Sequence, residues 1–208
     1  MAENLLEVRN LKKYFSTPRG MLHAVDNVTF NIEKGKTIGV VGESGCGKST
    51  LGKTLMRLHQ PTSGEVMFKG TDIANLDLKE FKKKYRSNIQ MIFQDPYASL
   101  DPRMSVLQLI SEPIKVNNKN LSKQEVEKKA KEMMELVGLA KRLEMAYPHE
   151  LDGGRRQRIG VARALSLNPD FIVCDEPVSA LDVSIQAQIL NLLQDLQKDR
   201  GLTYMFIT

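Results

Sequence analysis

Residues 42–49 read Gly-Glu-Ser-Gly-Cys-Gly-Lys-Ser, and this stretch is the strongest structural signal in the sequence. It matches the pattern G-x-x-x-x-G-K-[S/T] and lies between an apolar run, Thr37–Val41, and a helical pattern from Ser49 to Leu58. Glycines let a backbone wrap tightly with its N–H groups pointing inward, and a following helix adds the positive end of its dipole. The stretch therefore predicts a phosphate-binding loop between a strand and a helix.

The loop carries the residue types that a nucleoside triphosphate and its metal ion require. Lys48 brings a full positive charge to the β- and γ-phosphates. Ser49 offers a hydroxyl to Mg²⁺, an ion that prefers hard oxygen ligands. We expect the phosphates to meet the loop and the first helical turn at Gly42, Ser44, Gly45, Cys46, Gly47, Lys48, Ser49 and Thr50.

A second signal is the apolar run Phe171–Cys174, which is followed directly by two carboxylates, Asp175 and Glu176. Ligands of α/β sheets bind beyond the carboxyl ends of the strands, so these side chains are expected at a ligand site. Asp175 is expected to hold Mg²⁺, mostly through water, and Glu176 to orient and polarise the attacking water. Together with the phosphate-binding loop, the pair predicts a nucleotide hydrolase site.

The order of strand-like and helix-like segments predicts an α/β fold with a mostly parallel core sheet. The expected architecture is that of a P-loop NTPase with an N-terminal antiparallel β subdomain and an inserted α-helical subdomain. We expect residues 1–95 and 167–208 to form the nucleotide-binding core and residues 96–166 to form the helical insertion. The run Thr37–Val41 is expected to be a core strand buried on both faces.

Composition excludes several classes of protein. Of the 208 residues, 41% are hydrophobic and 26% are charged, as in soluble globular proteins. No run of 18 apolar residues could span a bilayer, and the first residues lack a secretory signal, so we expect a cytoplasmic protein. The two cysteines, Cys46 and Cys174, have no metal-ligand spacing and are expected to be reduced.

The net charge of +5 is mild and admits phosphate ligands, acidic lipid surfaces or nucleic acid. The one dense basic run is Lys79–Arg86. No pattern of aromatic side chains for base stacking accompanies it, so a solvated helix face is the favoured interpretation.

Several motifs resemble, in the same order, those of ATP-binding cassette (ABC) proteins, and the resemblance covers essentially the whole chain. Leu151-Asp152-Gly153-Gly154-Arg155 resembles the family's signature, normally Leu-Ser-Gly-Gly-Gln. Tyr14 stands where the family has its adenine-stacking aromatic residue, and Gln94 follows the predicted strand Ile89–Phe93. Ser179–Asp182 matches the loop that crosses the family's dimer interface.

This resemblance implies ATP and Mg²⁺ as ligands and gives each motif a role. Tyr14 would stack on adenine, and Asp152, Gly153 and Gly154 would face the γ-phosphate bound by an opposite subunit. Asp182, in the interface loop, is a further residue expected to bind the nucleotide. The implied catalytic residues are Glu176, Gln94 and Lys48, and the implied metal ligands are Ser49, Gln94 and Asp175.

Two further stretches, Phe93–Met104 and Tyr147–Leu151, look like the oligopeptide and dipeptide importer branch of the family. That branch implies a second ATPase subunit, identical or not, and transmembrane permease subunits as partners. An extracytoplasmic solute-binding protein would act indirectly, and no nucleic acid partner is expected. The implied location is peripheral, on the cytoplasmic face of the cell membrane.

The chain departs from the family pattern in the signature and at its end. Asp152 replaces the usual Ser and Arg155 the usual Gln, so a carboxylate would face a polyanion. Two like charges about 4 Å apart repel by about 1 to 4 kcal/mol, depending on screening, so we expect impaired closure of a dimer on ATP. The alternative is that Asp152 simply caps the following helix. The chain also stops at Thr208, before the family's switch histidine, and so resembles a C-terminally truncated cassette.

Two other functions stay open at this point. One is a nucleotide-binding module without turnover, which the departures from the signature favour. The other is a soluble, non-transport cassette ATPase that acts on DNA or ribosomes. Such proteins usually carry two cassettes or a long coiled-coil insertion, and this sequence has neither.

Overall fold

The structure, a computed structural model, describes residues 3–208 and divides into two compact units. The first comprises the described residues up to Met91, together with Asp170–Asp175 and Gln197–Thr208. The second comprises Ile92–Pro169 and Glu176–Leu196. The second unit thus includes a segment that the sequence-based boundaries assign to the nucleotide-binding core, and those boundaries stay a prediction.

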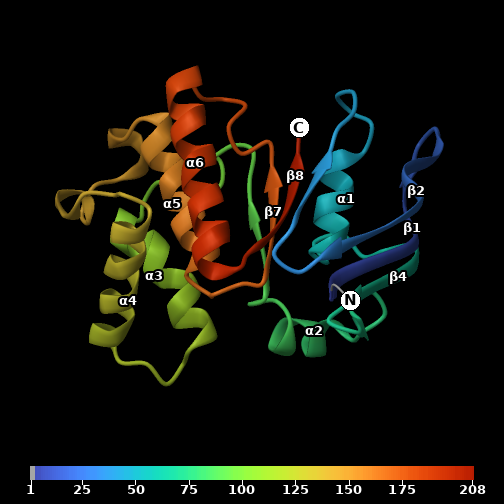
Figure 1. Cartoon of the computed structure of the whole chain (residues 1–208), viewed down its shortest axis with the longest axis horizontal. Helices are drawn as coiled ribbons and strands as arrows, with labels where there is room; N and C mark the ends of the chain where they lie inside the picture. Colours follow the sequence, from blue (N-terminus) through green and yellow to red (C-terminus); the bar gives the residue numbers. More distant parts are fainter. Residues whose placement is uncertain (1–2) are drawn as a thin grey trace. The chain divides into compact units, whose positions relative to one another are not determined.

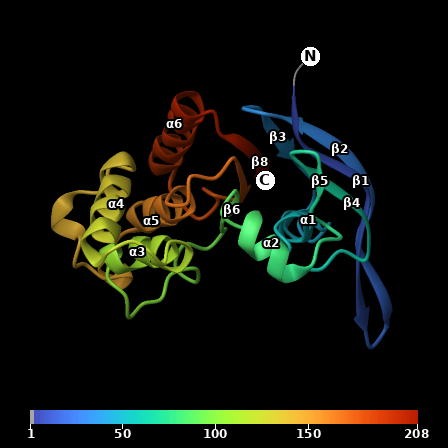
Figure 2. The same ribbon diagram turned by 90° about the horizontal axis from the view of Figure 1, so that it is seen from below.

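An antiparallel sheet with the strand order β2-β1-β4-β5 forms one part of the first unit (Figure 2). Its two long strands pair along their length, and the hairpin between them closes with Thr17 opposite Gly20. The register shifts several times along this pair, as β-bulges cause it to do. The strands are β1 (Asn4–Thr17), β2 (Gly20–Glu33), β4 (Ser63–Phe68) and β5 (Thr71–Asp72).

The second sheet of this unit has the strand order β3-β8-β7-β6 (β7 and β8 are labelled in Figure 1, β3 and β6 in Figure 2). Its central strand pairs, β3 with β8 and β7 with β8, are parallel. All five residues of β7 are buried, as expected from its apolar sequence. The strands are β3 (Thr37–Val40), β6 (Ile89–Ile92), β7 (Phe171–Asp175) and β8 (Thr203–Ile207).

The expectation that Thr37–Val41 is buried on both faces is wrong. The residues of β3 alternate between exposed and half-buried, and Val41, just beyond the strand, is 82% exposed. The reason is position, because β3 is an end strand in the sheet that the described residues form. An apolar run alone does not distinguish such a strand from a central one.

Helix α1 (Lys48–Leu55) packs between side chains of both sheets. Its Gly52 lies so close to the second sheet that a Cβ there would be 2.9 Å from Ile207 Cδ1 and from Val173 Cγ1. A further helix, α2 (Leu78–Lys84), is capped by Asp77, whose carboxylate accepts hydrogen bonds from two backbone N–H groups of the first turn. The hydrophobic core of the unit therefore joins the helix that follows the phosphate-binding loop to β7 and β8.

The second unit is helical, and three of its helices, α3, α4 and α5, pack against one another (Figure 1). Capping boxes start two of them: Ser105 with Gln108, and Ser122 with Glu125. Two short 3₁₀ turns, Lys141–Leu143 and Pro148–Glu150, connect α4 to α5. The helices are α3 (Val106–Asn117), α4 (Lys123–Leu136), α5 (Gly153–Leu165) and α6 (Val183–Arg200), whose last residues belong to the first unit.

The predicted α/β fold class, with an antiparallel and a mostly parallel sheet and a helical part, is confirmed. Among the helices of residues 3–208, none is long and apolar enough to cross a bilayer.

Candidate functional site

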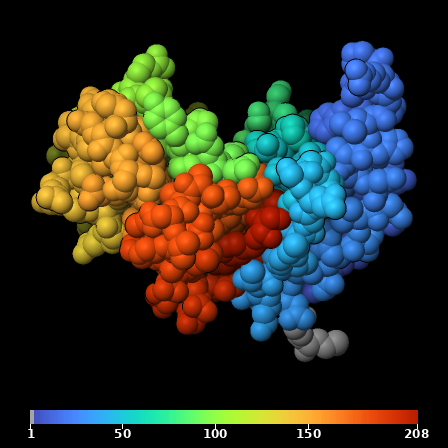
Figure 3. All heavy atoms as spheres, turned by 90° about the horizontal axis from the view of Figure 1, so that it is seen from above, coloured from blue at the N-terminus to red at the C-terminus, as the bar shows by residue number. Residues whose placement is uncertain are grey.

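The predicted phosphate-binding loop connects β3 to α1 and lies at the surface of the first unit, where Figure 3 draws it in light blue. Gly45 and Gly47 have φ angles of 80° and 100°, a region that L side chains rarely adopt. Gly47 also touches β2, because a Cβ at this position would lie 2.0 Å from the Ala24 carbonyl oxygen. Glycine is therefore required at these positions for two reasons: the backbone has positive φ angles, and the loop packs closely against β2 at Gly47.

The first turn of α1 is open to an anion. Gly47 stands at the N-cap, where no side chain accepts a hydrogen bond from the backbone N–H groups of the turn. No acidic residue lies in that turn either. Free N–H groups and the positive end of the helix dipole favour a bound phosphate there. Ser44 and Cys46 are exposed in the loop, and Thr50 is half-buried in the first turn.

Lys48 folds back over the loop that precedes it. Its Nζ donates hydrogen bonds to the carbonyl oxygens of Gly42, at 2.7 Å, and of Glu43, at 2.8 Å. The ammonium group is therefore held across the loop by neutral acceptors. Phosphate oxygens, which carry negative charge, would make stronger hydrogen bonds with it than these carbonyls do.

Ser49 and Asp175 meet although 126 residues separate them. The Ser49 hydroxyl donates a hydrogen bond of 2.7 Å to Asp175 Oδ1, and Asp175 is only 3% exposed. A hydroxyl and a carboxylate oxygen in contact are the donor set that Mg²⁺ accepts alongside water and phosphate. Within residues 3–208 there is no group of three or more His, Cys, Asp or Glu side chains that could hold a metal ion. The Ser49 hydroxyl and the Asp175 carboxylate supply two oxygen ligands that fit Mg²⁺ bound together with a phosphate.

Glu176 and Gln94, both in the second unit, also meet. Gln94 Nε2 donates a hydrogen bond of 2.7 Å to Glu176 Oε2. Glu176 has a φ angle of 43°, in the left-handed region that non-glycine residues seldom occupy. Strained backbone of this kind is concentrated at functional sites, where it fixes the direction of a side chain. The direction of the Glu176 carboxylate is thus fixed by its backbone conformation and by the hydrogen bond from Gln94. Because Gln94 is uncharged, this contact does not neutralise the carboxylate.

The resemblance to the ABC signature falls at the N-terminus of α5. Asp152 is the N-cap, with its Oδ1 2.8 Å from the Arg155 backbone nitrogen, and its Oδ2 is 3.4 Å from Arg155 Nη1. The cap is therefore formed, and the arginine that replaces the family's Gln faces the carboxylate that replaces its Ser.

The two signature glycines are required by packing inside the second unit. A Cβ on Gly153 would lie 2.9 Å from Leu181 Cδ2, and a Cβ on Gly154 would lie 2.7 Å from Ile185 Cγ2. Asp182, between those contacts, accepts a hydrogen bond of 3.0 Å from the Ile185 backbone at the start of α6. The signature turn and the predicted interface loop are therefore in direct contact.

Tyr14 is not an isolated ring. It stacks on His23 of β2, with ring centroids 3.8 Å apart and planes 8° from parallel, and its hydroxyl donates a hydrogen bond of 2.5 Å to Asp26 Oδ1. Sequence reasoning did not find His23 or Asp26 as site residues. Both residues lie on β2, the strand that pairs with the strand of Tyr14. Finding them from the sequence would have required the β1–β2 register, which the sequence does not specify.

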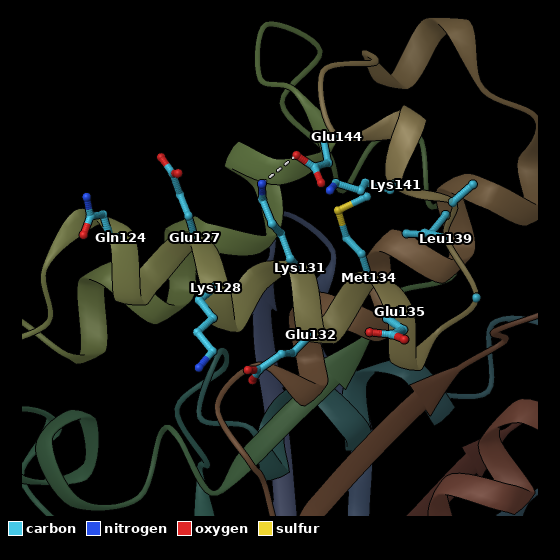
Figure 4. Close-up of a pocket in the computed structure, with 12 residues that line it drawn as sticks. Gln124, Glu127, Lys128, Lys131, Glu132, Met134, Glu135, Leu139, Lys141 and Glu144 are labelled. Atoms are coloured by element: carbon cyan, nitrogen blue, oxygen red, sulfur yellow. Dashed lines mark ion pairs between the residues drawn. The ribbon is translucent and has the colours of Figure 1, made fainter.

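A cavity of about 880 Å³ lies on α4 and the segment that follows it. Lys131 and Glu144 form an ion pair of 2.9 Å at its wall and point toward each other in Figure 4. None of the predicted nucleotide-site residues lines it. Opposite charges share the wall, so it has no surplus of positive charge for a polyphosphate: Glu127, Glu132, Glu135 and Glu144 stand with Lys128, Lys131 and Lys141.

A glycine-rich loop before an uncapped helix, a lysine across that loop, and a serine paired with a buried aspartate at the end of a parallel strand define a P-loop nucleotide-binding protein. The sequence pattern of the ABC transporter family matches residues 25–179. The chain belongs to that family.

Two curated relatives from Bacillus subtilis (strain 168) are similar over nearly the whole chain. The oligopeptide transport ATP-binding protein OppF is 52% identical over 207 residues, with 100% of this chain and 68% of OppF covered. The oligopeptide transport ATP-binding protein AppF is 51% identical, with 99% of this chain and 64% of AppF covered. The chain thus spans about two thirds of the length of these relatives.

Solved structures of cassettes are also similar. The dimeric cassette MJ0796 bound to ADP and Pi, in a post-hydrolysis state, matches with a TM-score of 0.85 and 31% identity, covering 98% of this chain and 87% of that one. The structure of cbiO1 from Clostridium perfringens, part of a cbiONQ transporter complex, matches with a TM-score of 0.84 and 29% identity, covering 99% of this chain and 78% of that one.

Proposed function

We propose that this chain binds MgATP and hydrolyses it as the energy-coupling subunit of an importer for oligopeptides or dipeptides. The observation that carries the proposal is the hydrogen bond from Ser49 to the buried Asp175 beside the open first turn of α1. It joins the two motifs that a nucleotide hydrolase needs. Similarity to oligopeptide transport ATP-binding proteins supports the peptide substrate.

In the proposed nucleotide complex, the loop Gly42–Gly47 and the first turn of α1 hold the phosphates through backbone N–H groups. Lys48 exchanges its two carbonyl acceptors for β- and γ-phosphate oxygens, which removes no hydrogen bond and adds charge attraction. Ser49 and Asp175 hold Mg²⁺, with Gln94 as a further ligand. When bound, this ion neutralises charge on the phosphates. Tyr14 receives the adenine.

Hydrolysis needs a water molecule aligned with the γ-phosphate, and Glu176 is the proposed residue that orients and polarises it. Two features support this role: the unusual backbone conformation of Glu176 and its uncharged partner Gln94. A carboxylate that is not neutralised by an arginine or lysine remains available to accept a proton from water.

The proposed assembly is a head-to-tail dimer of cassettes, identical or different. In it, Asp152, Gly153 and Gly154 of one subunit face the γ-phosphate of the other, and Asp182 lies at the interface. The dimeric form of the similar cassette MJ0796 supports this arrangement. We further propose permease subunits as membrane partners at the cytoplasmic face, and a solute-binding protein that acts indirectly through them. Residues 1–95 and 167–208 would form the ATP-binding core and residues 96–166 the helical insertion.

Binding and turnover should be measured on the same preparation. A fluorescent ATP analogue is titrated into the wild type and into Lys48→Ala, and phosphate release is followed with ATP and Mg²⁺. We expect Lys48→Ala to weaken binding severely, because the main fixed positive charge is removed. Equal affinities of the two proteins would reject the proposed nucleotide site.

A module that binds nucleotide without turnover is a second candidate, and one observation favours it: the signature turn carries an Asp152 carboxylate. Binding without phosphate release, even with permease subunits present, would support that candidate. Co-purification with permease subunits would separate both from a soluble, non-transport cassette ATPase.

A further inference from the structure

We infer that His23 and Asp26 belong to the nucleotide site, where they position the Tyr14 ring as a platform for the base. The inference rests on the proposed ATP-binding function and adds two positioning residues to it. It comes from contacts in the β1–β2 hairpin rather than from a sequence motif.

The platform begins with strand pairing. In the register of β1 and β2, Tyr14 lies directly opposite His23, so both side chains stand on the same face of the sheet. The rings are parallel within 8° and their centroids are 3.8 Å apart, which is van der Waals contact. A base does not fit between rings at that spacing. It can only add to an outer face of the pair, where it continues the stack.

A single carboxylate faces both rings and is hydrogen-bonded to one of them. Asp26 Oδ1 accepts the 2.5 Å hydrogen bond from the Tyr14 hydroxyl, and Oδ2 lies 3.7 Å from His23 Nδ1. Lys12 Nζ lies 3.7 Å from Asp26 Oδ1 and balances the charge. The hydrogen bond from Tyr14 holds the pKa of Asp26 below its usual value, and the same bond raises the pKa of Tyr14. The phenol therefore remains a donor and the carboxylate an acceptor over a wide pH range.

The ring pair is also connected to the phosphate-binding loop. Ala24 follows His23 on β2, and its carbonyl oxygen lies 2.0 Å from the place of a Cβ on Gly47. The strand that carries His23 thus supports the loop in front of α1. The ring pair therefore lies at a fixed distance from the phosphate-binding loop. A nucleotide needs such an arrangement, because its base and its phosphates are at opposite ends of the molecule.

Exposure separates this cluster from ordinary packing. The side chains of His23 and Asp26 are 53% and 49% exposed, so neither is enclosed by a hydrophobic core. Their main effect is to fix the orientation of the Tyr14 ring before a ligand arrives. A ring that is already ordered loses less freedom on binding, and affinity increases by that difference.

The test compares a ligand with a base to one without. Binding of ATP and of inorganic tripolyphosphate is measured by titration calorimetry for wild type, His23→Ala, Asp26→Ala and Lys48→Ala. We expect His23→Ala and Asp26→Ala to weaken ATP binding about three- to tenfold, as partial loss of base stacking would. Their affinity for tripolyphosphate should stay at the wild-type value. Lys48→Ala should weaken the binding of both ATP and tripolyphosphate.

Two more variants control for structure. His23→Phe keeps a ring opposite Tyr14 and should retain ATP affinity. Tyr14→Phe removes only the hydroxyl, so its combination with Asp26→Ala should bind ATP no more weakly than Asp26→Ala alone, because the hydrogen bond between the two residues is already lost in that variant.

Equal losses for ATP and tripolyphosphate in His23→Ala, or wild-type ATP affinity in both His23→Ala and Asp26→Ala, would overturn the platform. If Lys48→Ala still loses both ligands in that case, the proposed nucleotide site stands without the platform. If Lys48→Ala binds both ligands as well as the wild type does, the proposed nucleotide site is rejected.

Discussion

The Ser49 hydroxyl donates a 2.7 Å hydrogen bond to Oδ1 of Asp175. Ser49 lies in the first turn of α1 and Asp175 ends β7, so the contact fixes the start of the helix against the carboxyl end of a buried strand. Both oxygens are already at the distance at which they could share a metal ion or one of its waters.

Ser49→Ala should reduce the benefit that Mg²⁺ gives to ATP binding, because one of the proposed oxygen ligands is lost. We expect apparent Mg²⁺ affinity in the presence of ATP to fall by at least about tenfold, while ATP binding in EDTA is little changed. Ser49→Thr keeps the hydroxyl and is the matched control. A Mg²⁺ titration at fixed ATP checks this, and an unchanged Mg²⁺ dependence in Ser49→Ala would exclude Ser49 as a ligand.

Gly47→Ala should disrupt the loop far more than Gly45→Ala does. Both residues have positive φ, where a Cβ costs about 1–2 kcal/mol. At Gly47 the added Cβ would also clash with the backbone of β2, because it would lie 2.0 Å from the Ala24 carbonyl oxygen. Nothing lies within 4 Å of a Cβ on Gly45. Thermal unfolding with and without ATP checks this. Gly47→Ala should have the lower Tm and no ATP-induced shift, and equal behaviour of the two variants would contradict the close contact.

The two strongest motifs could be predicted because each is local. The sequence 42–49 and the run Phe171–Glu176 carry their own strand and helix boundaries, and the structure has β3, α1 and β7 at those positions. The meeting of Ser49 with Asp175 follows from the rule that ligands lie at the carboxyl ends of parallel strands.

The base platform could not be predicted, because it depends on strand register. The β1–β2 pairing shifts between Leu11 and Lys13 and again between Lys13 and Tyr14. From the hairpin turn to Tyr14 the register is regular, so His23 could be counted once the turn was placed, but Asp26 lies beyond the shifts and its approach to the Tyr14 hydroxyl could not be. The packing of Gly154 on Ile185 was likewise hidden, because it joins segments that only the fold brings together.

Glu176→Gln should abolish most hydrolysis and leave ATP binding intact. The amide can still accept the hydrogen bond from Gln94, so the local geometry is preserved, but it cannot take a proton from water. We expect phosphate release to fall by about 10²- to 10⁴-fold. Phosphate release and ATP affinity are measured side by side. A variant that retained wild-type turnover would show that another group polarises the water.

The signature turn carries two opposite charges, on Asp152 and Arg155. Asp152 caps α5, and its carboxylate also faces Arg155 at 3.4 Å. Asp152→Ser retains a capping oxygen and removes the negative charge, whereas Asp152→Ala removes both and should lower stability by about 1 kcal/mol. If the carboxylate opposes the γ-phosphate of a second subunit, relief of repulsion should make Asp152→Ser dimerise on ATP more readily than the wild type.

Arg155 determines how large that gain is, because its guanidinium offsets part of the Asp152 charge. Arg155→Gln alone leaves the carboxylate without this partner and should weaken ATP-dependent dimerisation, while Asp152→Ser with Arg155→Gln should improve it. Light scattering with ATP, together with phosphate release, measures these differences, and the Tm of each variant reports whether the cap has survived. Should the wild type already dimerise and turn over as well as the double variant, Asp152 acts only as a helix cap and the impairment hypothesis is wrong.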